Sequence, residues 1–184
     1  TEVDKYITYN YLEQSWTIGT TNDGFTRTAW NPAYILDNPI ATGKLDTTDN
    51  NYLYNHEKGY DDDGSALNSS IESSQIDIGD GDRFAFISQL IPDLTFNGSD
   101  ADNPSVNITV EGRNFPGGDY LQSDTSAVTR TAVSTSTVPF EQWTNKADIR
   151  VRGRAFNLSV SSSDSGVRWR LGSPRVQARP DGRR

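Results

Sequence analysis

The fold is decided by the stretch DIRVRGRAFNLSVSSSDSGVRWRLGSPRVQARPDGRR, residues 148–184. Its first part alternates apolar residues with arginines, as a half-buried strand does: Ile149 and Val151 against Arg150, Arg152 and Arg154. The phase then slips by one residue, because Phe156, Leu158 and Val160 fall on the parity of the arginines. One straight strand cannot bury both sets, since a one-residue shift turns every side chain to the other face. We therefore expect a bulge or a change of sheet near Gly153.

A second alternating segment follows in the same stretch. Residues 161–166 are polar and contain the residue types of a turn. After them, apolar residues again alternate with arginines: Val167, Trp169 and Leu171 against Arg168 and Arg170. The pattern predicts a hairpin between this segment and the strand before it.

Composition narrows the class of protein. The chain has 184 residues, of which 33% are hydrophobic, and the polar remainder is rich in Ser, Thr, Asn, Asp and Gly, as in turn-rich β proteins. Cysteine is absent, which excludes disulfides, thiol nucleophiles and Cys-ligated metals. No run approaches the roughly 18 apolar residues of a membrane span, so we expect no stable membrane insertion. Methionine is absent even at position 1, and we expect the chain to continue a longer polypeptide.

Charge is distributed unevenly along the chain. Residues 1–100 contain 5 Lys/Arg and 17 Asp/Glu, a net charge of −12, whereas residues from Lys146 onward contain 10 and 3, a net charge of +7. We prefer the interpretation that the alternating arginines form the solvated face of a sheet and pair with acidic neighbours. A polyanion partner, or self-association between an acidic surface of one copy and a basic surface of the next, fits the same asymmetry.

Residues 1–68 predict a β-meander. Short strand candidates occur at residues 5–10, 13–20, 27–30, 39–43 and 51–57. A tight turn at Tyr11–Leu12 joins the first two, and Asn31–Pro32 stops the third. A meander that opens on a strand without its own beginning resembles one blade of a propeller.

The order of phrases in this meander carries a family resemblance. The phrases are KYITYNYLEQSWTIGT, RTAW, PIAT and YLYNHEKGYDDDG. In this order they resemble the closing blade of the tail nozzle proteins of short-tailed bacteriophages, the tail tubular protein B family. The resemblance implies that earlier blades lie upstream of Thr1.

Residues 69–184 predict an antiparallel β-sandwich. The stretch 59–74 has no hydrophobic period, and we place the domain boundary within it, after residue 68. The clearest strand is Ser105–Arg113, in which Val106, Ile108 and Val110 share one face. In residues 83–91 apolar residues occupy both parities, so we expect a strand covered on both sides or bent at Ser88–Gln89.

Weaker signals complete the second domain. Residues 94–96 predict a short strand, and residues 125–138 an exposed hairpin or edge strand. Residues 140–146 are compatible with one helical turn. We expect six to eight strands after residue 70, the number that a small sandwich needs.

The second domain strengthens the resemblance. Its phrases include DIGDGDRFAFI, LIPDLTFNGS, NPSVNITV, RNFPGG, VPFEQWT, IRVRGRAF and WRLGSPRVQARPDGRR. They are similar to the carboxyl domain of nozzle-like structural proteins of these phages. The resemblance implies a virion tail protein without enzymatic activity, a homohexameric ring that lines the DNA-ejection channel, and the tail adaptor protein and tail fibres as partners. In that ring we expect the acidic residues 1–100 to face the lumen, and the arginines of 150–154 and 168–170 to face neighbours, fibres or solvent.

The chain offers weak candidates for chemistry. His56 is the one histidine and lies in an alternating Tyr/Leu/Tyr segment without a Gly-x-Ser-x-Gly turn, so we expect a structural strand or surface residue. The runs Asp61–Gly64 and Asp77–Asp82 suggest calcium ligands, but neither completes an EF-hand loop, and turns explain them better. We therefore assign no catalytic, cofactor or metal residues.

The tryptophans separate two further hypotheses. They are Trp16, Trp30, Trp143 and Trp169. Two or more exposed on one concave face favour a receptor- or polysaccharide-binding sandwich at the tail tip, whereas burial of all four favours a scaffold. For Trp169 we expect core packing. A third hypothesis, a glycan hydrolase, requires a cleft in which carboxylates converge.

Overall fold

The computed structural model describes residues 5–20, 25–33, 36–45, 51–79, 81–114 and 134–182. Its regular structure in these ranges consists of β-strands, and every strand pair is antiparallel, which confirms the all-β prediction. The chain divides into two compact units, Thr1–Gly59 and Tyr60–Arg184. The division falls at the start of the expected boundary stretch, so residues 60–68, which we had placed in the first domain, belong to the second unit.

In the first unit the expected single meander is replaced by two sheets. One is a hairpin of β1 (Lys5–Asn10) and β2 (Ser15–Thr20), and the other has the order β3 (Phe25–Asn31), β4 (Ile40–Leu45), β5 (Asn51–Asn55). Alternation indicates which face of a strand is buried but not which strand it pairs with. The sequence therefore predicted the strands and missed the break between β2 and β3.

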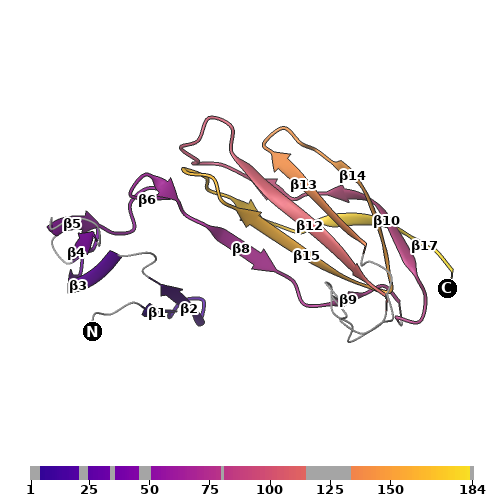
Figure 1. Cartoon of the computed structure of the whole chain (residues 1–184), viewed down its shortest axis with the longest axis horizontal. Coiled ribbons are helices and arrows are strands. Elements are labelled where there is room, and N and C mark those ends of the chain that lie inside the picture. Colours follow the sequence, from indigo (N-terminus) through magenta and orange to yellow (C-terminus); the bar gives the residue numbers. More distant parts are fainter. Residues whose placement is uncertain are drawn as a thin grey trace, which may run out of the picture. The chain divides into compact units, whose positions relative to one another are not determined.

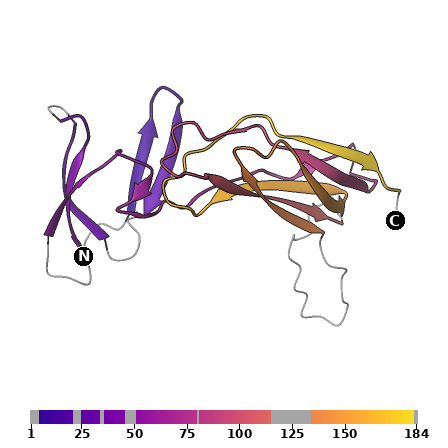
Figure 2. The same cartoon turned by 90° about the horizontal axis from the view of Figure 1, so that it is seen from above.

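The second unit contains two larger sheets, which Figures 1 and 2 show as separate layers. The first sheet has the order β14 (Ala147–Gly153), β10 (Ala85–Ile91), β17 (Arg175–Pro180). The second has the order β13 (Thr135–Glu141), β12 (Ser105–Arg113), β15 (Ala155–Ser162), β8 (Ser69–Glu72), and β9 (Ile76–Asp77) also pairs with β15. The described part of this unit also contains two short pairs: β6 (Asp61–Asp62) with β7 (Ser65–Ala66), and β11 (Leu94–Thr95) with β16 (Arg170–Leu171).

The two larger sheets enclose one hydrophobic core. Its largest fully buried side chains come from both sheets: Ile87, Leu90 and Val151 from the first, and Val106, Ile108, Phe140 and Val160 from the second. Burial of these side chains is the main stabilising contribution, at roughly 1.5–3 kcal/mol for each large aliphatic or aromatic group.

The expected change of sheet near Gly153 is confirmed. The strand β14 belongs to the first sheet and ends at Gly153, and β15 begins at Ala155 in the second. Arg154 carries the chain across, and its N–H donates to the carbonyl of Arg113 at 2.7 Å. Because the two strands lie in different sheets, Val151 and Phe156 both face the core although their parities differ.

The expected irregularity in the strand of residues 83–91 is a bulge. The register of β10 against both of its neighbours shifts between Ile87 and Gln89. A bulge inserts one extra residue and so reverses the parity of the buried face. Ile87 before the bulge and Leu90 after it are therefore both buried.

Three further expectations need correction or extension. The terminal hairpin is wrong, because β16 pairs with β11 rather than with β15. The helical turn at residues 140–146 is also wrong, because β13 extends to Glu141 and a turn follows, closed by the N–H of Thr144 donating to the carbonyl of Glu141. The edge strands β8 and β17 had no sequence signal that we recognised, and most of residues 125–138 lies outside the described ranges.

Candidate functional site

Arginines gather on the outer face of the first sheet of the second unit. Phe86 of β10 lies opposite Arg152 of β14 and opposite Arg179 of β17. Since Ile87 and Val151, one position along each strand, point into the core, this row points outward. We call the set the arginine face: Arg150, Arg152, Arg154, Arg175, Arg179, Phe84 and Phe86.

The guanidinium groups of Arg152, Arg154 and Arg179 stack on the phenylalanine rings of this face. The Cζ atoms of Arg152 and Arg154 lie 3.9 and 4.8 Å from the centroid of Phe84. The Cζ atom of Arg179 lies 4.9 Å from the centroid of Phe86. Cations at this distance from an aromatic face are attracted by the ring quadrupole, by about 0.5–1 kcal/mol at exposed sites. The rings therefore hold the arginine side chains in place on the sheet.

One of these arginines has an acidic partner near the carboxyl end. Arg152 Nε pairs with Asp181 Oδ2, and both side chains are 39% exposed. Arg150 is exposed on the same strand. Both observations fit our interpretation of the alternating arginines as a solvated sheet face. Phe84 is only 7% exposed on this outer face, because the arginines cover it.

The first aspartate run forms a hairpin. Asp61 pairs with Ala66 and Asp62 with Ser65. Asp63 and Gly64 between them both have positive φ, 52° and 81°, as a two-residue type I′ turn requires. All three aspartates are exposed, and we call them the acidic hairpin. The turn interpretation of this run is confirmed.

The second aspartate run begins with Asp77, the last residue of β9, and continues toward β10. Gly79 and Gly81 have positive φ, 76° and 70°, which fits a turn. Asp80 lies outside the described residues. Within the described ranges, no three His, Cys, Asp or Glu side chains are grouped so that they could hold a metal ion.

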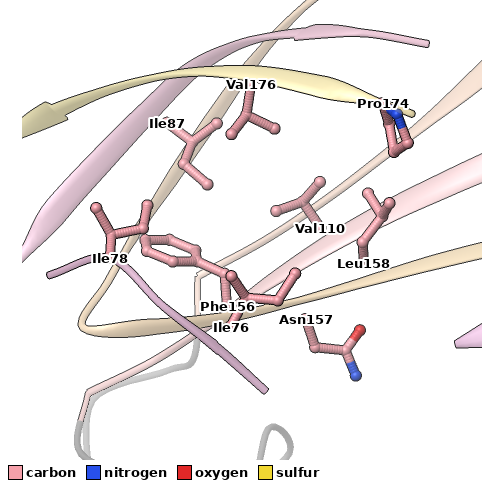
Figure 3. Close-up of a pocket in the computed structure, with 9 residues that line it drawn as sticks. All are labelled: Ile76, Ile78, Ile87, Val110, Phe156, Asn157, Leu158, Pro174 and Val176. Atoms are coloured by element: carbon pink, nitrogen blue, oxygen red, sulfur yellow. The ribbon is translucent and has the colours of Figure 1, made fainter. Parts of the chain in front are cut away.

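A hollow of about 260 Å³ opens between the two larger sheets. Figure 3 shows apolar side chains converging on it from both sheets, with the Asn157 amide turned away. The lining residues are Ile76, Ile78, Ile87, Val110, Phe156, Asn157, Leu158, Pro174 and Val176, and none of them is a carboxylate. Ile76 and Val176 on the two edge strands are about half exposed, so the hollow is reached from the side where β9 and β17 lie.

His56 lies one residue beyond β5, in the first unit. Its Nε2 accepts a hydrogen bond from Arg27 Nε at 3.0 Å, and its ring lies 4.4 Å from the ring of Trp30. The guanidinium of Arg27 in turn lies 4.0 Å from the ring of Tyr54. The side chain of Arg27 is buried although it is charged. Through these contacts His56 belongs to a polar and aromatic cluster that joins β3 to the end of β5.

The tryptophans divide by element. Trp169 packs against the core, as expected, and its Nε1 donates to Ser69 Oγ at 2.8 Å. Trp16, Trp30 and Trp143 are exposed by 68%, 53% and 77%. They lie on β2, on β3 and in the turn after β13, so the criterion for a scaffold, burial of all four tryptophans, is not met.

The hairpin β1–β2 carries an uncovered apolar face. Ile7 pairs with Ile18 and Tyr9 with Trp16, so these four side chains share one face, and the rings of the second pair lie 4.5 Å apart. The exposed large apolar residues of the hairpin are Tyr6, Ile7, Tyr9, Tyr11, Leu12, Trp16 and Ile18. Sequence alternation predicted the strands but gave no indication that this face stays exposed.

Comparison with known proteins gives no family. No model of a protein family matches the chain, and no curated protein matches it. Within the described part of the chain, no helix has the length and apolar content that crossing a bilayer requires.

Proposed function

We propose that this chain is a non-enzymatic structural protein of a virion, a component of the tail nozzle of a short-tailed bacteriophage. It assembles into a homo-oligomeric ring, a hexamer, which lines the channel for DNA ejection. The first unit takes the place of the last blade of a propeller, although its strands form two sheets, and the second unit is a distal β-sandwich. The proposal is supported by the order of the phrases that resemble the family and by the all-β architecture.

The observation that carries the proposal is the apolar face of the β1–β2 hairpin. A single two-stranded hairpin is marginally stable in water, and four apolar side chains on one of its faces favour association. A neighbouring copy in a ring supplies a cover for such a face. In the sheets of the described residues, β8 and β17 are edge strands, and such edges offer further hydrogen-bonding groups of the kind that assembly conceals.

The mechanism of the ring is geometric and electrostatic. Rigid β domains around a rotational axis enclose a channel. An acidic wall repels DNA phosphates, so the DNA slides through rather than binding, and the acidic residues of 1–100 that do not meet a neighbouring copy suit such a wall. The tail adaptor protein and the tail fibres contact the ring from outside the channel.

Oligomeric state tests the proposal. Mass photometry and negative-stain microscopy of the chain should show a six-fold ring. The variant Ile7→Thr/Ile18→Thr keeps β-branched side chains but removes apolar surface, so it should weaken the ring. The matched control, Thr8→Ser/Thr17→Ser on the opposite hairpin face, should leave it intact. A wild-type chain that stays monomeric or trimeric at every concentration contradicts the proposal.

A second candidate function is receptor or polysaccharide binding at the tail tip. The observation that favours it is the exposure of three tryptophans, which are effective stacking surfaces for sugars. Binding of host surface glycan should then fall when Trp16, Trp30 or Trp143 is replaced by alanine. Equal binding by all three variants and the wild type rejects this function.

A further inference from the structure

We infer that the arginine face of one copy docks on the acidic hairpin of a second copy. The inference rests on the proposed homo-oligomer and names the two surfaces that meet in it. Arginine and carboxylate are the partners with the strongest hydrogen bonds available to surface side chains, because both groups are charged and the guanidinium fork matches the two carboxylate oxygens.

The arginine face is prepared for a carboxylate partner. Stacking on Phe84 and Phe86 fixes Arg152, Arg154 and Arg179 on the sheet, and Arg152 is also held by its pairing with Asp181. Docking therefore costs less side-chain entropy than it does with mobile arginines. The exposed Arg150 and Arg175 lie on the two outer strands of the same sheet face.

The acidic hairpin is equally ordered. Its turn has positive φ at both central residues, which fits the twist of the two strands and fixes their register. Asp61 and Asp62 are consecutive strand residues, so their carboxylates lie on opposite faces of the hairpin, and Asp63 follows in the turn. The three exposed carboxylates surround the tip of one short hairpin and offer several oxygen acceptors to guanidinium groups.

The acidic hairpin lies at one end of the second unit, whereas the carboxyl end of β17 lies toward the other, as the labels β6 and β17 in Figure 1 show. Arg179 near the end of β17 and Arg152 in the same row therefore lie away from the acidic hairpin of their own copy. Contact between two different surfaces of identical copies is heterologous, and such contacts generate rings when the rotation between copies closes.

Charge reversal with compensation tests the docking. Asp61→Arg/Asp62→Arg and Arg150→Glu/Arg175→Glu should each weaken assembly by at least about tenfold in dissociation constant, which is about 1.4 kcal/mol. The chain that carries all four changes should recover the wild-type value to within about threefold, because the pairing is restored with reversed sign. Lys146→Glu, an exposed change outside both surfaces, is the control and should have little effect.

The measurements are sedimentation velocity and mass photometry over a range of salt concentrations, with circular dichroism to verify that each variant is folded. If assembly withstands both charge reversals, the docking inference is overturned and the ring proposal stays in place. If the wild-type chain is a monomer, the ring proposal and the docking inference are both overturned. Failure of the compensated chain to recover also overturns the docking inference. Binding of a labelled single-stranded oligonucleotide is measured as well. If the wild type binds it and Arg150→Glu/Arg175→Glu does not, while the variant still forms the ring, the arginine face binds nucleic acid instead and the docking inference is overturned.

Discussion

Replacing Gly153 with alanine tests how closely the two larger sheets approach at the point where the chain passes between them. A Cβ atom at Gly153 would lie 2.9 Å from Gly112 Cα and 3.0 Å from both N and O of Arg113. All three are backbone atoms, so relief requires the strands to separate rather than a side chain to rotate. Overpacking of this kind costs about 1–3 kcal/mol. For a chain of this size each kcal/mol lowers Tm by about 2–4 °C.

A double-variant cycle sharpens this prediction. A Cβ at Gly112 would lie 2.7 Å from the carbonyl oxygen of Arg152, so Gly112→Ala opens the same contact. The two costs should therefore sum to more than the cost of the double variant. Urea denaturation followed by tryptophan fluorescence measures all three. Gly172→Ala is the control with a smaller loss, because the three atoms nearest to its Cβ belong to the Asp93 carboxylate, a side-chain group that can move at the cost of the hydrogen bond it accepts from the N–H of Ser173. Stability of Gly153→Ala within about 0.5 kcal/mol of wild type, or strict additivity, refutes the reasoning.

Three other predictions concern single contacts of the second unit and use the same denaturation assay. Phe140→Ala removes a fully buried ring and should cost about 3–5 kcal/mol; a loss below 2 kcal/mol would contradict its place in the core. Trp169→Phe and Ser69→Ala each break the hydrogen bond between Nε1 and Oγ, so each should cost about 0.5–1.5 kcal/mol, and full additivity in the double variant would argue against a shared bond. Asp181→Asn removes the carboxylate beside Arg152, and because both side chains are 39% exposed the cost should stay at or below about 1 kcal/mol at low salt; a larger cost that persists at high salt would show that the pair is more than a surface contact.

The alternation of residues within a single strand was sufficient to predict features that depend on that strand alone. Alternation of Val106, Ile108 and Val110 placed β12 correctly, with bounds of Ser105–Arg113. The phase slip after Val151 indicated the change of sheet, because no single strand satisfies both parities. The mixed parity around Ser88 indicated the bulge by the same argument. The turn at Asp63–Gly64 could also be predicted, since Asp and Gly are residue types that tolerate positive φ.

The pairing between strands that are distant in the sequence could not be predicted from the sequence. The strand β17 is exposed at every residue, and its partner β10 lies far away in the sequence, so neither period nor turn revealed it. The segment of Leu171 had the expected alternation but found its partner in Leu94.

The arginine face depends on such pairing. The sequence suggested that the arginines point outward, but the rings beneath them come from β10 and its preceding residue, and only the register reveals that contact.

The central place of β10 determines the order in which a newly made chain can mature. Ile87 of β10 pairs with Val151 of β14 and Ala178 of β17, and both partners are synthesised long after Ile87. Until then the apolar side of β10 is open to the wrong neighbours, and synthesis of the remaining strands becomes the slow step of folding. We therefore expect aggregation to be most favoured during synthesis, when unfinished chains on neighbouring ribosomes expose β10 to one another.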